Sequence, residues 1–349
     1  MKRNLRFLGT MLCAAFAAFA FTACSSDDDG DGDGNPPVNP IEKEYFTIEN
    51  AEFVSGEMPE STTSDALQGV YCNDQALSNG GNFITISSPV EYERFYVAVE
   101  GVEGYYDFMA VNEATRADAG AQNFTYTIPV YYSVDLGDNF VLVISGVTVE
   151  GYITPKYTQE ITHVESLAGD LLINLVFDQP KDVDLHLIMP SGREIYFSDK
   201  GDEAYNEETN SWEKLFGLDH DSNPGCRIDN LNNENISIPF EYVQKGKYTV
   251  IVNLYSNCDY SVPVNYSLQV RYKGELVENM LPEGVNPLRG YYEADASRGD
   301  HTVVMEFEIN EGIEVDDNND NYDEVEPMYQ RRMIPQSPAA KAKLMMKND

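Results

Sequence analysis

Hydrophobic and polar residues alternate along most of the chain in short runs, and turn-forming Gly, Asn, Asp and Pro residues separate these runs. The alternation has the two-residue period of a strand that buries one face. It predicts strands over 45–53, 82–87, 93–99, 123–134, 139–149, 171–177, 183–189, 194–197, 235–240, 247–255, 265–272 and 302–309. Many short strands with turn residues between them predict an all-β fold built from β-sandwiches.

The first 23 residues have the three parts of a secretory signal peptide. Lys2, Arg3 and Arg6 precede an apolar run over 7–21, and small residues stand immediately before Cys24. The apolar run is too short to span a bilayer comfortably. This pattern predicts export from the cytoplasm.

The tetrapeptide Phe21-Thr22-Ala23-Cys24 resembles a bacterial lipobox, although lipoboxes prefer Leu where this chain has Phe21. The resemblance implies that the signal is cut before Cys24 and that the thiol of Cys24 receives a diacylglycerol. Each buried acyl methylene contributes about 0.8 kcal/mol, so two or three acyl chains hold a protein on a membrane. The alternative is an ordinary signal peptide with an incidental cysteine.

An acidic segment follows Cys24. The run Ser25-Ser26-Asp27-Asp28-Asp29 resembles the export signal of surface lipoproteins in Bacteroidetes-type bacteria, which implies an outer-membrane lipoprotein that faces the cell exterior. Residues 24–44 are rich in Ser, Asp, Gly, Asn and Pro, and such segments bury too little apolar surface to fold. We therefore predict a lipid anchor and a disordered acidic linker over 24–44.

The charge balance limits the partners of the protein. The whole chain has 23 basic and 59 acidic residues, a net charge of −36. Loss of residues 1–23 removes three basic and no acidic residues, so 20 basic residues face 59 acidic ones, a net charge of −39. Such a charge repels nucleic acid and anionic membrane surfaces, and it favours cations, basic partners or neutral ligands.

The remaining length suffices for two domains with separate cores. Residues 45–160 are expected to form an immunoglobulin-like β-sandwich, and residues 161–312 a second β-sandwich. The segment 313–349 is first acidic and then basic, without a sustained apolar period, and we predict a disordered tail. Its Asp/Asn-rich run lacks the glycine of an EF-hand loop.

Three cysteines follow Cys24, an odd number for an oxidising compartment. Cys226 and Cys258 lie in the same predicted domain, so a disulfide is expected between them. Cys72 is then most simply a buried apolar residue. A catalytic thiol needs a neighbouring base, and no base can be assigned.

The densest polar cluster begins on the predicted strand 183–189. Strand geometry places Val183 and Leu185 on one face and Asp182 and Asp184 on the other. Adjacent carboxylates repel each other unless they are solvated, paired or bound to a cation. Further acidic residues follow in the Gly- and Pro-containing segment 217–229, namely Asp219, Asp221 and Asp229.

Three interpretations of Asp182, Asp184, Asp219, Asp221 and Asp229 stay open. These residues cap turns and pair with Arg193 or Arg227, or they bind one Ca²⁺, which takes six to eight oxygen ligands in flexible geometry, or they contact a ligand directly. Zinc is less favoured, because no Cys or His pair has the short spacing of a zinc site.

The order of motifs in the second half is similar to that of the YfaP-type domain. The motifs are Asp-Val-Asp-Leu-His-Leu, Met-Pro-Ser-Gly, Gly-Leu-Asp-His-Asp-Ser-Asn-Pro-Gly-Cys and Gly-Lys-Tyr-Thr-Val, within about residues 170–278. This family is a β-sandwich module of secreted and envelope bacterial proteins. The resemblance implies a YfaP-like or jelly-roll-like sandwich outside the cytoplasm, and it implies no particular ligand.

Trp212, the only tryptophan, lies near Tyr205 in a segment that is expected to be a polar loop of about 20 residues. Exposed aromatic rings offer flat faces on which sugars stack. The alternative is that Trp212 packs against its own domain.

Together these features predict a non-catalytic cell-surface lipoprotein that is a binding or adhesion module for an extracellular glycan or protein. The sequence contains no His-Glu-x-x-His, no Gly-x-Ser-x-Gly and no phosphate-binding glycine loop. Two alternatives stay open. One is a glycoside hydrolase or peptidase whose carboxylates only the fold brings together. The other is a structural component of a surface assembly.

Overall fold

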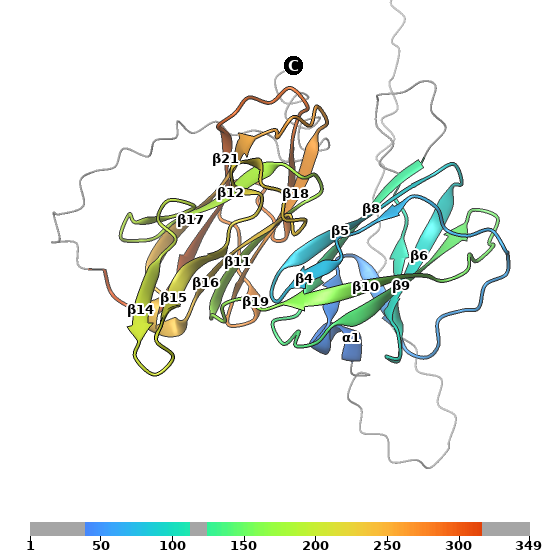
Figure 1. Ribbon diagram of the computed structural model, residues 1–349, viewed down its shortest axis with the longest axis horizontal. Coiled ribbons are helices and arrows are strands. Elements are labelled where there is room, and N and C mark those ends of the chain that lie inside the picture. The colour runs from blue at the N-terminus through green and yellow to red at the C-terminus, as the bar shows by residue number, and fades with distance from the viewer. Residues whose placement is uncertain (1–38, 112–123, 316–349) are drawn as a thin grey trace, which may run out of the picture. The chain divides into compact units, whose positions relative to one another are not determined.

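Figure 1 shows the computed structural model, which describes residues 39–111 and 124–315. These residues form strands joined by a short α-helix and two single-turn 3-10 helices, α1 (Pro40–Glu44), η1 (Pro224–Cys226) and η2 (Phe240–Tyr242). The prediction of an all-β fold is therefore confirmed. The predicted signal peptide, Cys24, most of the linker and nearly all of the tail lie outside the described residues.

The strands before residue 165 form two sheets. They are β1 (Phe46–Ile48), β2 (Ala51–Val54), β3 (Val70–Tyr71), β4 (Gln75–Leu77), β5 (Gly81–Ser88), β6 (Tyr92–Val99), β7 (Tyr105–Met109), β8 (Phe124–Tyr132), β9 (Phe140–Thr148) and β10 (Tyr157–Val164). One sheet has the order β1-β8-β5-β3, and the other has the order β2-β7-β6-β9-β10-β4. Strands β4 and β10 pair in parallel, and the other described pairs in these sheets are antiparallel.

Both sheets contribute side chains to one apolar core. Phe46 and Ile128 come from the first sheet, and Phe95 and Ile144 come from the second, and each is fully buried. Burial of each such side chain contributes about 1.5–3 kcal/mol relative to exposure. Two sheets packed through a shared core make this region a β-sandwich, as the alternation predicted.

The folded region begins before the first strand. The side chain of Asn39 accepts a hydrogen bond from the backbone N–H of Glu42 at 3.1 Å, which caps the short helix α1. Pro40 occupies the first helical turn, and Ile41 is fully buried in the core. Residues 39–44, which were predicted as part of the disordered linker, are therefore folded.

The strands after residue 170 form two further sheets. They are β11 (Leu171–Phe177), β12 (Asp182–Ile188), β13 (Glu194–Ile195), β14 (Asp202–Asn206), β15 (Ser211–His220), β16 (Asn233–Ile238), β17 (Gly246–Ser256), β18 (Val264–Tyr272), β19 (Glu275–Leu276), β20 (Leu288–Tyr292) and β21 (Asp300–Ile309). One sheet has the order β14-β15-β16-β11-β18-β19, and β20 also pairs with β18. The other has the order β13-β12-β17-β21.

These two sheets also share one core. Ile173 and Leu268 of the larger sheet and Leu185 and Val252 of the smaller sheet are fully buried in it. Val183 and Leu187 lie in the same core, as the period of the strand predicted. The opposite face of β12 is buried as well, which the sequence did not predict.

The predicted polar loop before Cys226 was wrong, because this segment forms the antiparallel hairpin β14–β15. Four of the five residues of β14 are exposed and none is fully buried. The strand therefore lacks the apolar alternation that reveals strands in a sequence. Backbone hydrogen bonds to β15, rather than burial of apolar side chains, stabilise this strand.

None of the four described sheets combines strands from before residue 165 with strands from after residue 170. Buried hydrogen bonds nevertheless join the two sequence regions. The hydroxyls of Tyr131 and Ser267 are 2.6 Å apart, and the side-chain amide of Asn233 donates to the carbonyl of Gly81 at 2.8 Å. The division of the chain into two domains stays a prediction.

Candidate functional site

Three carboxylates from three different elements meet at one edge of the strand β12. They belong to Asp184 of β12, Asp221 in the turn that follows β15, and Glu234 of β16. One oxygen of each lies within 4.8 Å of an oxygen of the others. Asp184 and Glu234 are buried, with 3% and 1% of their surface exposed. We call these three residues the carboxylate cluster.

Backbone groups fix the carboxylate of Glu234 in this cluster. One of its oxygens accepts the N–H of Leu185 at 2.6 Å, and the other accepts the N–H of Ser222 at 3.3 Å. Leu185 follows Asp184 and Ser222 follows Asp221 in the chain. The two N–H groups therefore hold the carboxylate of Glu234 close to those of Asp184 and Asp221. Lys200 provides a positive charge, with its Nζ 2.8 Å from an oxygen of Asp221.

Several buried oxygens at the cluster have no hydrogen-bond partner among the described residues. They are Oδ2 of Asp184, Oδ1 of Asp221 and Oδ1 of Asn253. Asn253 is 6% exposed and lies directly opposite Asp184 in the pairing of β12 with β17, so the two side chains share a face of the sheet. Buried polar atoms normally have a partner, and each exception calls for a physical reason.

The burial of these acids opposes their ionisation. Burial, followed by the negative charges of Asp182 and Asp221, raises the pKa of Asp184 to about 8. Burial and the charge of Asp184 also raise the pKa of Glu234 well above its usual value. These two buried acids are therefore stable either in their protonated form or as carboxylates that are neutralised by a bound cation.

The other aspartates predicted as calcium ligands lie outside the carboxylate cluster. Asp182 is close enough to raise the pKa of Asp184, but its Oδ2 accepts the N–H of Gly225 at 2.8 Å. Burial raises the pKa of Asp182 to about 6. Asp219 accepts the N–H of Leu167 at 2.6 Å, and burial raises its pKa to about 6 as well.

Asp229 has the opposite environment. It accepts hydrogen bonds from the hydroxyl of Ser222 at 2.8 Å, the N–H of Leu231 at 2.9 Å and the ring Nε2 of His220 at 3.0 Å. Burial opposes its ionisation, but these donors outweigh burial and lower the pKa of Asp229. Asp229 therefore acts as a structural acceptor that holds the turn.

Glu234 and Asn253 were missed by sequence reasoning as cluster members. Glu234 stands among other polar residues of β16, and Asn253 stands between two apolar residues of β17, so neither gives a clear signal in the sequence. Only the fold shows that Glu234 reaches β12 from the opposite sheet. The predicted disulfide between Cys226 and Cys258 is present. Cys72 is a free, half-buried thiol.

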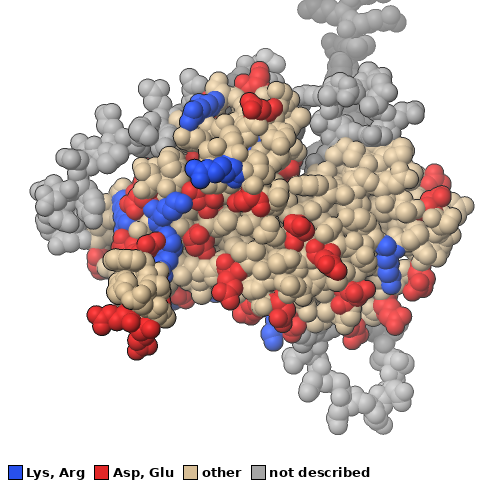
Figure 2. Space-filling model, in the orientation of Figure 1, with Lys and Arg blue, Asp and Glu red and all other residues tan. Residues whose placement is uncertain are grey.

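The aromatic residues singled out in the sequence lie on the hairpin β14–β15. Tyr205 and Trp212 are paired across the two strands, and their ring centroids are 5.6 Å apart at an angle of 66°. Trp212 is 68% exposed and Tyr205 is 47% exposed. The alternative that Trp212 packs into its own domain is therefore wrong. Figure 2 shows acidic side chains gathered near this hairpin, at the lower left.

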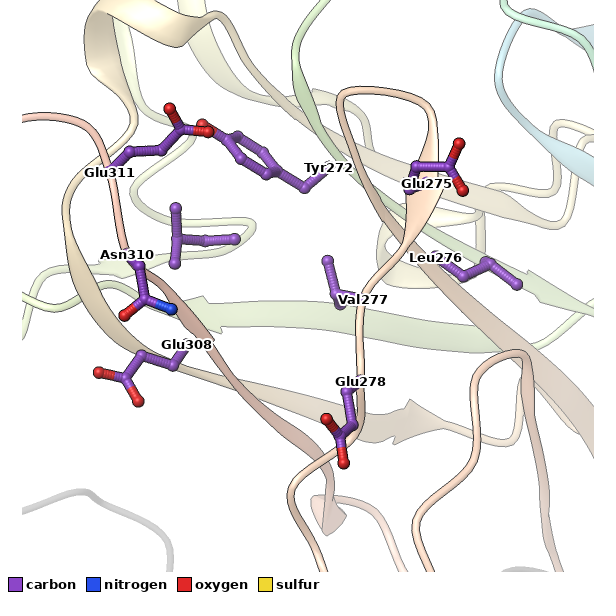
Figure 3. A pocket seen from close by; sticks show the side chains of 9 residues that line it. Tyr272, Glu275, Leu276, Val277, Glu278, Glu308, Asn310 and Glu311 are labelled. Atoms are coloured by element: carbon purple, nitrogen blue, oxygen red, sulfur yellow. The ribbon is translucent and has the colours of Figure 1, made fainter.

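A groove of about 400 Å³ lies where β19 passes the end of β21 (Figure 3). Val277 and Ile309 contribute apolar surface, and Leu276 is 41% exposed. Glutamates surround the groove, namely Glu275, Glu278, Glu308 and Glu311. Sequence reasoning did not identify this groove, because its residues come from two separate parts of the chain, 272–278 and 308–311, which only the fold brings together.

Comparison with known proteins transfers no function to this chain. No protein-family model matches it, and no curated protein matches it. A crystal structure of a chicken TCR is 10% identical; the match covers 58% of this chain and 98% of that chain, with a TM-score of 0.18. The immunoglobulin-like and YfaP-like assignments of the two regions stay predictions. No helix within residues 39–111 and 124–315 has the length and apolar character needed to cross a membrane.

Proposed function

We propose that the protein is a non-catalytic lipoprotein of the bacterial outer membrane that binds an extracellular glycan or protein at the cell surface. The hairpin β14–β15 provides the contact surface. The observation that carries this proposal is the exposure of Trp212, at 68%, beside the exposed ring of Tyr205. Removing an aromatic ring from water is favourable, so an exposed pair of rings is a ready surface for a partner.

The charge of the hairpin limits the chemistry of this ligand. Glu203, Glu207, Glu208 and Glu213 are exposed on the two strands and the turn between them. Their charge disfavours anionic ligands such as sulfated or acidic sugars. We therefore infer that the ligand is a neutral glycan or a protein surface with basic residues around an apolar centre.

The membrane anchor rests on the sequence alone. Cys24 directly follows the predicted signal peptide and precedes the acidic run that resembles a surface-export signal. Metabolic labelling with a fatty acid should mark the wild-type protein in its native host and leave the Cys24→Ala variant unlabelled. Labelling that persists in this variant would refute lipidation at Cys24.

The ligand site can be tested with the chain without residues 1–24, which keeps every described residue. This protein is applied to an array of neutral and acidic glycans and to basic and acidic peptides. We expect binding to neutral glycans or to basic peptides, and the Trp212→Ala variant should lose at least about fivefold in affinity, because truncation of a central aromatic contact costs about 1 kcal/mol or more.

Leu276→Ala is the matched control, since Leu276 is another exposed apolar residue of the same region and lies in the acidic groove. It should bind like the wild type. Loss of binding in Leu276→Ala but not in Trp212→Ala would move the ligand site to the groove. A product released from any ligand by the wild type would refute the non-catalytic assignment.

A further inference from the structure

The carboxylate cluster consists entirely of oxygen donors. Asp184, Asp221 and Glu234 supply carboxylates, and Asn253 supplies an amide oxygen on the same face as Asp184. Nitrogen or sulfur ligands typical of zinc and copper sites are absent from these four side chains. Oxygen donors of this kind suit hard divalent cations.

We propose that Asp184, Asp221 and Glu234, together with the amide oxygen of Asn253, bind one calcium ion. Calcium binds oxygens at about 2.3–2.6 Å, so two oxygens on opposite sides of the ion are about 5 Å apart. The cluster meets this condition, because its three oxygens lie within 4.8 Å of one another. Magnesium usually keeps several waters and uses one or two carboxylates, whereas calcium accepts a larger set of protein oxygens.

The unpartnered oxygens supply an independent reason for a ligand. Oδ2 of Asp184, Oδ1 of Asp221 and Oδ1 of Asn253 are buried and lack a hydrogen-bond partner. Asp184 is 3% exposed, so bulk water does not compensate its carboxylate. A cation among these oxygens would satisfy all three at once, and it would also offset the repulsion between the carboxylates.

The positive charge beside the carboxylate cluster is too small to neutralise its three acids. Lys200 pairs with Asp221 from the surface, with its side chain 46% exposed. Its amine therefore remains largely solvated and neutralises at most one of three acids. The N–H groups of Leu185 and Ser222 orient Glu234 but carry no net charge. A bound calcium ion would bring two positive charges to this place.

The ion would join three separate elements. Asp184 lies on the smaller sheet, Glu234 lies on the larger sheet, and Asp221 lies in the turn that follows β15. Calcium would therefore cross-link the two sheets of the sandwich at an edge where no β-ladder connects them. This site is separate from the proposed ligand contact at Trp212, and either can fail without the other.

The experiment uses the chain without residues 1–24, freed of metal with a chelator and kept in about 0.15 M NaCl to screen weak ion binding to the acidic surface. Calcium chloride is titrated in a calorimeter, and thermal unfolding is recorded with and without calcium. We expect binding of about one equivalent and a rise in melting temperature of about 5 °C at saturation. Magnesium chloride should produce a smaller rise.

Asp184→Asn is the decisive variant, since Oδ2 of Asp184 is buried and accepts no hydrogen bond from the described residues. It should weaken calcium binding at least about tenfold, because it removes one charged ligand. Asp219→Asn is the matched control. It lies two residues from Asp221 in the same region, but its carboxylate accepts the N–H of Leu167 outside the cluster, so this variant should keep the wild-type affinity within about twofold.

Absence of heat together with an unchanged melting temperature would refute the site. Equal losses in Asp184→Asn and Asp219→Asn would show that general negative charge attracts the ion, which also refutes it. A larger effect of magnesium would overturn the assignment of calcium. If Asp184→Asn does not fold, Asp221→Asn takes its place, because its charge is removed at the less buried end of the cluster.

Discussion

The two ends of strand β15 have opposite environments. Trp212 near its start is exposed beside Tyr205, whereas Asp221 just after its end lies in the buried carboxylate cluster. An apolar ring is exposed at one end, and charged groups are buried at the other. Each is the reverse of the usual distribution between surface and interior.

An apolar ring in water and a carboxylate in the interior are both in unfavourable environments, and a binding partner would relieve each of them. A ligand that covers the exposed ring lowers the free energy of the system, and a cation that binds the buried carboxylates does the same. Asp229 lies in the same turn as Asp221 and shows the alternative outcome. Three donors surround its carboxylate, so it needs nothing from outside the chain.

Substitution of Asp229 should have the largest effect. Asp229→Ala leaves the donors of Ser222, Leu231 and His220 without their acceptor, and we expect a loss of about 2–4 kcal/mol in the free energy of unfolding at pH 7. Urea unfolding followed by circular dichroism measures this loss. An effect below about 0.5 kcal/mol would contradict the structural role of Asp229.

The same variant has a defined pH dependence. The pKa of Asp229 is lower in the folded chain than its ordinary value, so its stabilisation is complete above the unfolded value near 4 and declines as the pH falls through the folded value. The difference in stability between the wild type and Asp229→Ala should therefore shrink in acid. A difference that grows on acidification would give the opposite sign and refute this assignment.

Asp184→Asn should change stability in the opposite direction when calcium is absent. Burial raises the pKa of Asp184 to about 8, so without a cation folding at pH 7 requires this carboxylate to take up a proton, which costs free energy. Asn avoids this cost and should increase the free energy of unfolding by about 1–3 kcal/mol. Unfolding in the presence of a chelator measures the gain. In saturating calcium the wild type should be more stable than the variant. If the variant remains more stable in calcium, the buried carboxylates at this end of β15 do not gain stability from a cation.

Lys200→Met should have a smaller effect. Lys200 pairs with Asp221, and about half of the Lys200 side chain is exposed to solvent. Loss of this ion pair should therefore lower the free energy of unfolding by at most about 1 kcal/mol without calcium. With calcium bound, the cost should decrease, because the ion then neutralises Asp221. Paired melting curves with and without calcium measure both values. A larger cost in calcium would mean that Lys200, rather than a cation, neutralises the cluster.

Trp212→Ala should have the smallest effect on stability. Most of the ring is exposed, so its truncation should change the free energy of unfolding by no more than about 0.5 kcal/mol. Thermal unfolding checks this expectation. A loss of several kcal/mol would show that the hairpin depends on the pair of Trp212 with Tyr205 for its own folding.

The sequence predicted the main strands well. The period of two located β11 at residues 171–177, and it located β5, β6 and β9 within one residue at each end. These strands bury one face or both, so their apolar residues follow the strand geometry. It did not predict β7, β10, β20 or the hairpin β14–β15, and it joined β1 and β2, which lie in different sheets, into one strand over 45–53. The strand β14 is mostly exposed and is held by backbone pairing, so it shows no apolar period.

The candidate site was predicted in part. Sequence reasoning identified Asp184 and Asp221, because acidic residues at a strand and in a Gly/Pro turn stand out against apolar surroundings. It grouped Asp219 with them, although Asp219 faces Leu167. A register shift between Leu218 and His220 disturbs the alternation at this point of β15, and bulges of this kind redirect side chains.

The sequence by itself determined the all-β class, the buried faces of the main strands and the large excess of negative charge. These properties depend on local period and composition, which a linear chain contains in full. Only the tertiary structure decided which acids share one site and which aromatic rings face solvent. Glu234 reaches Asp184 from the opposite sheet, 50 residues along the chain, and the packing of the two sheets creates that contact.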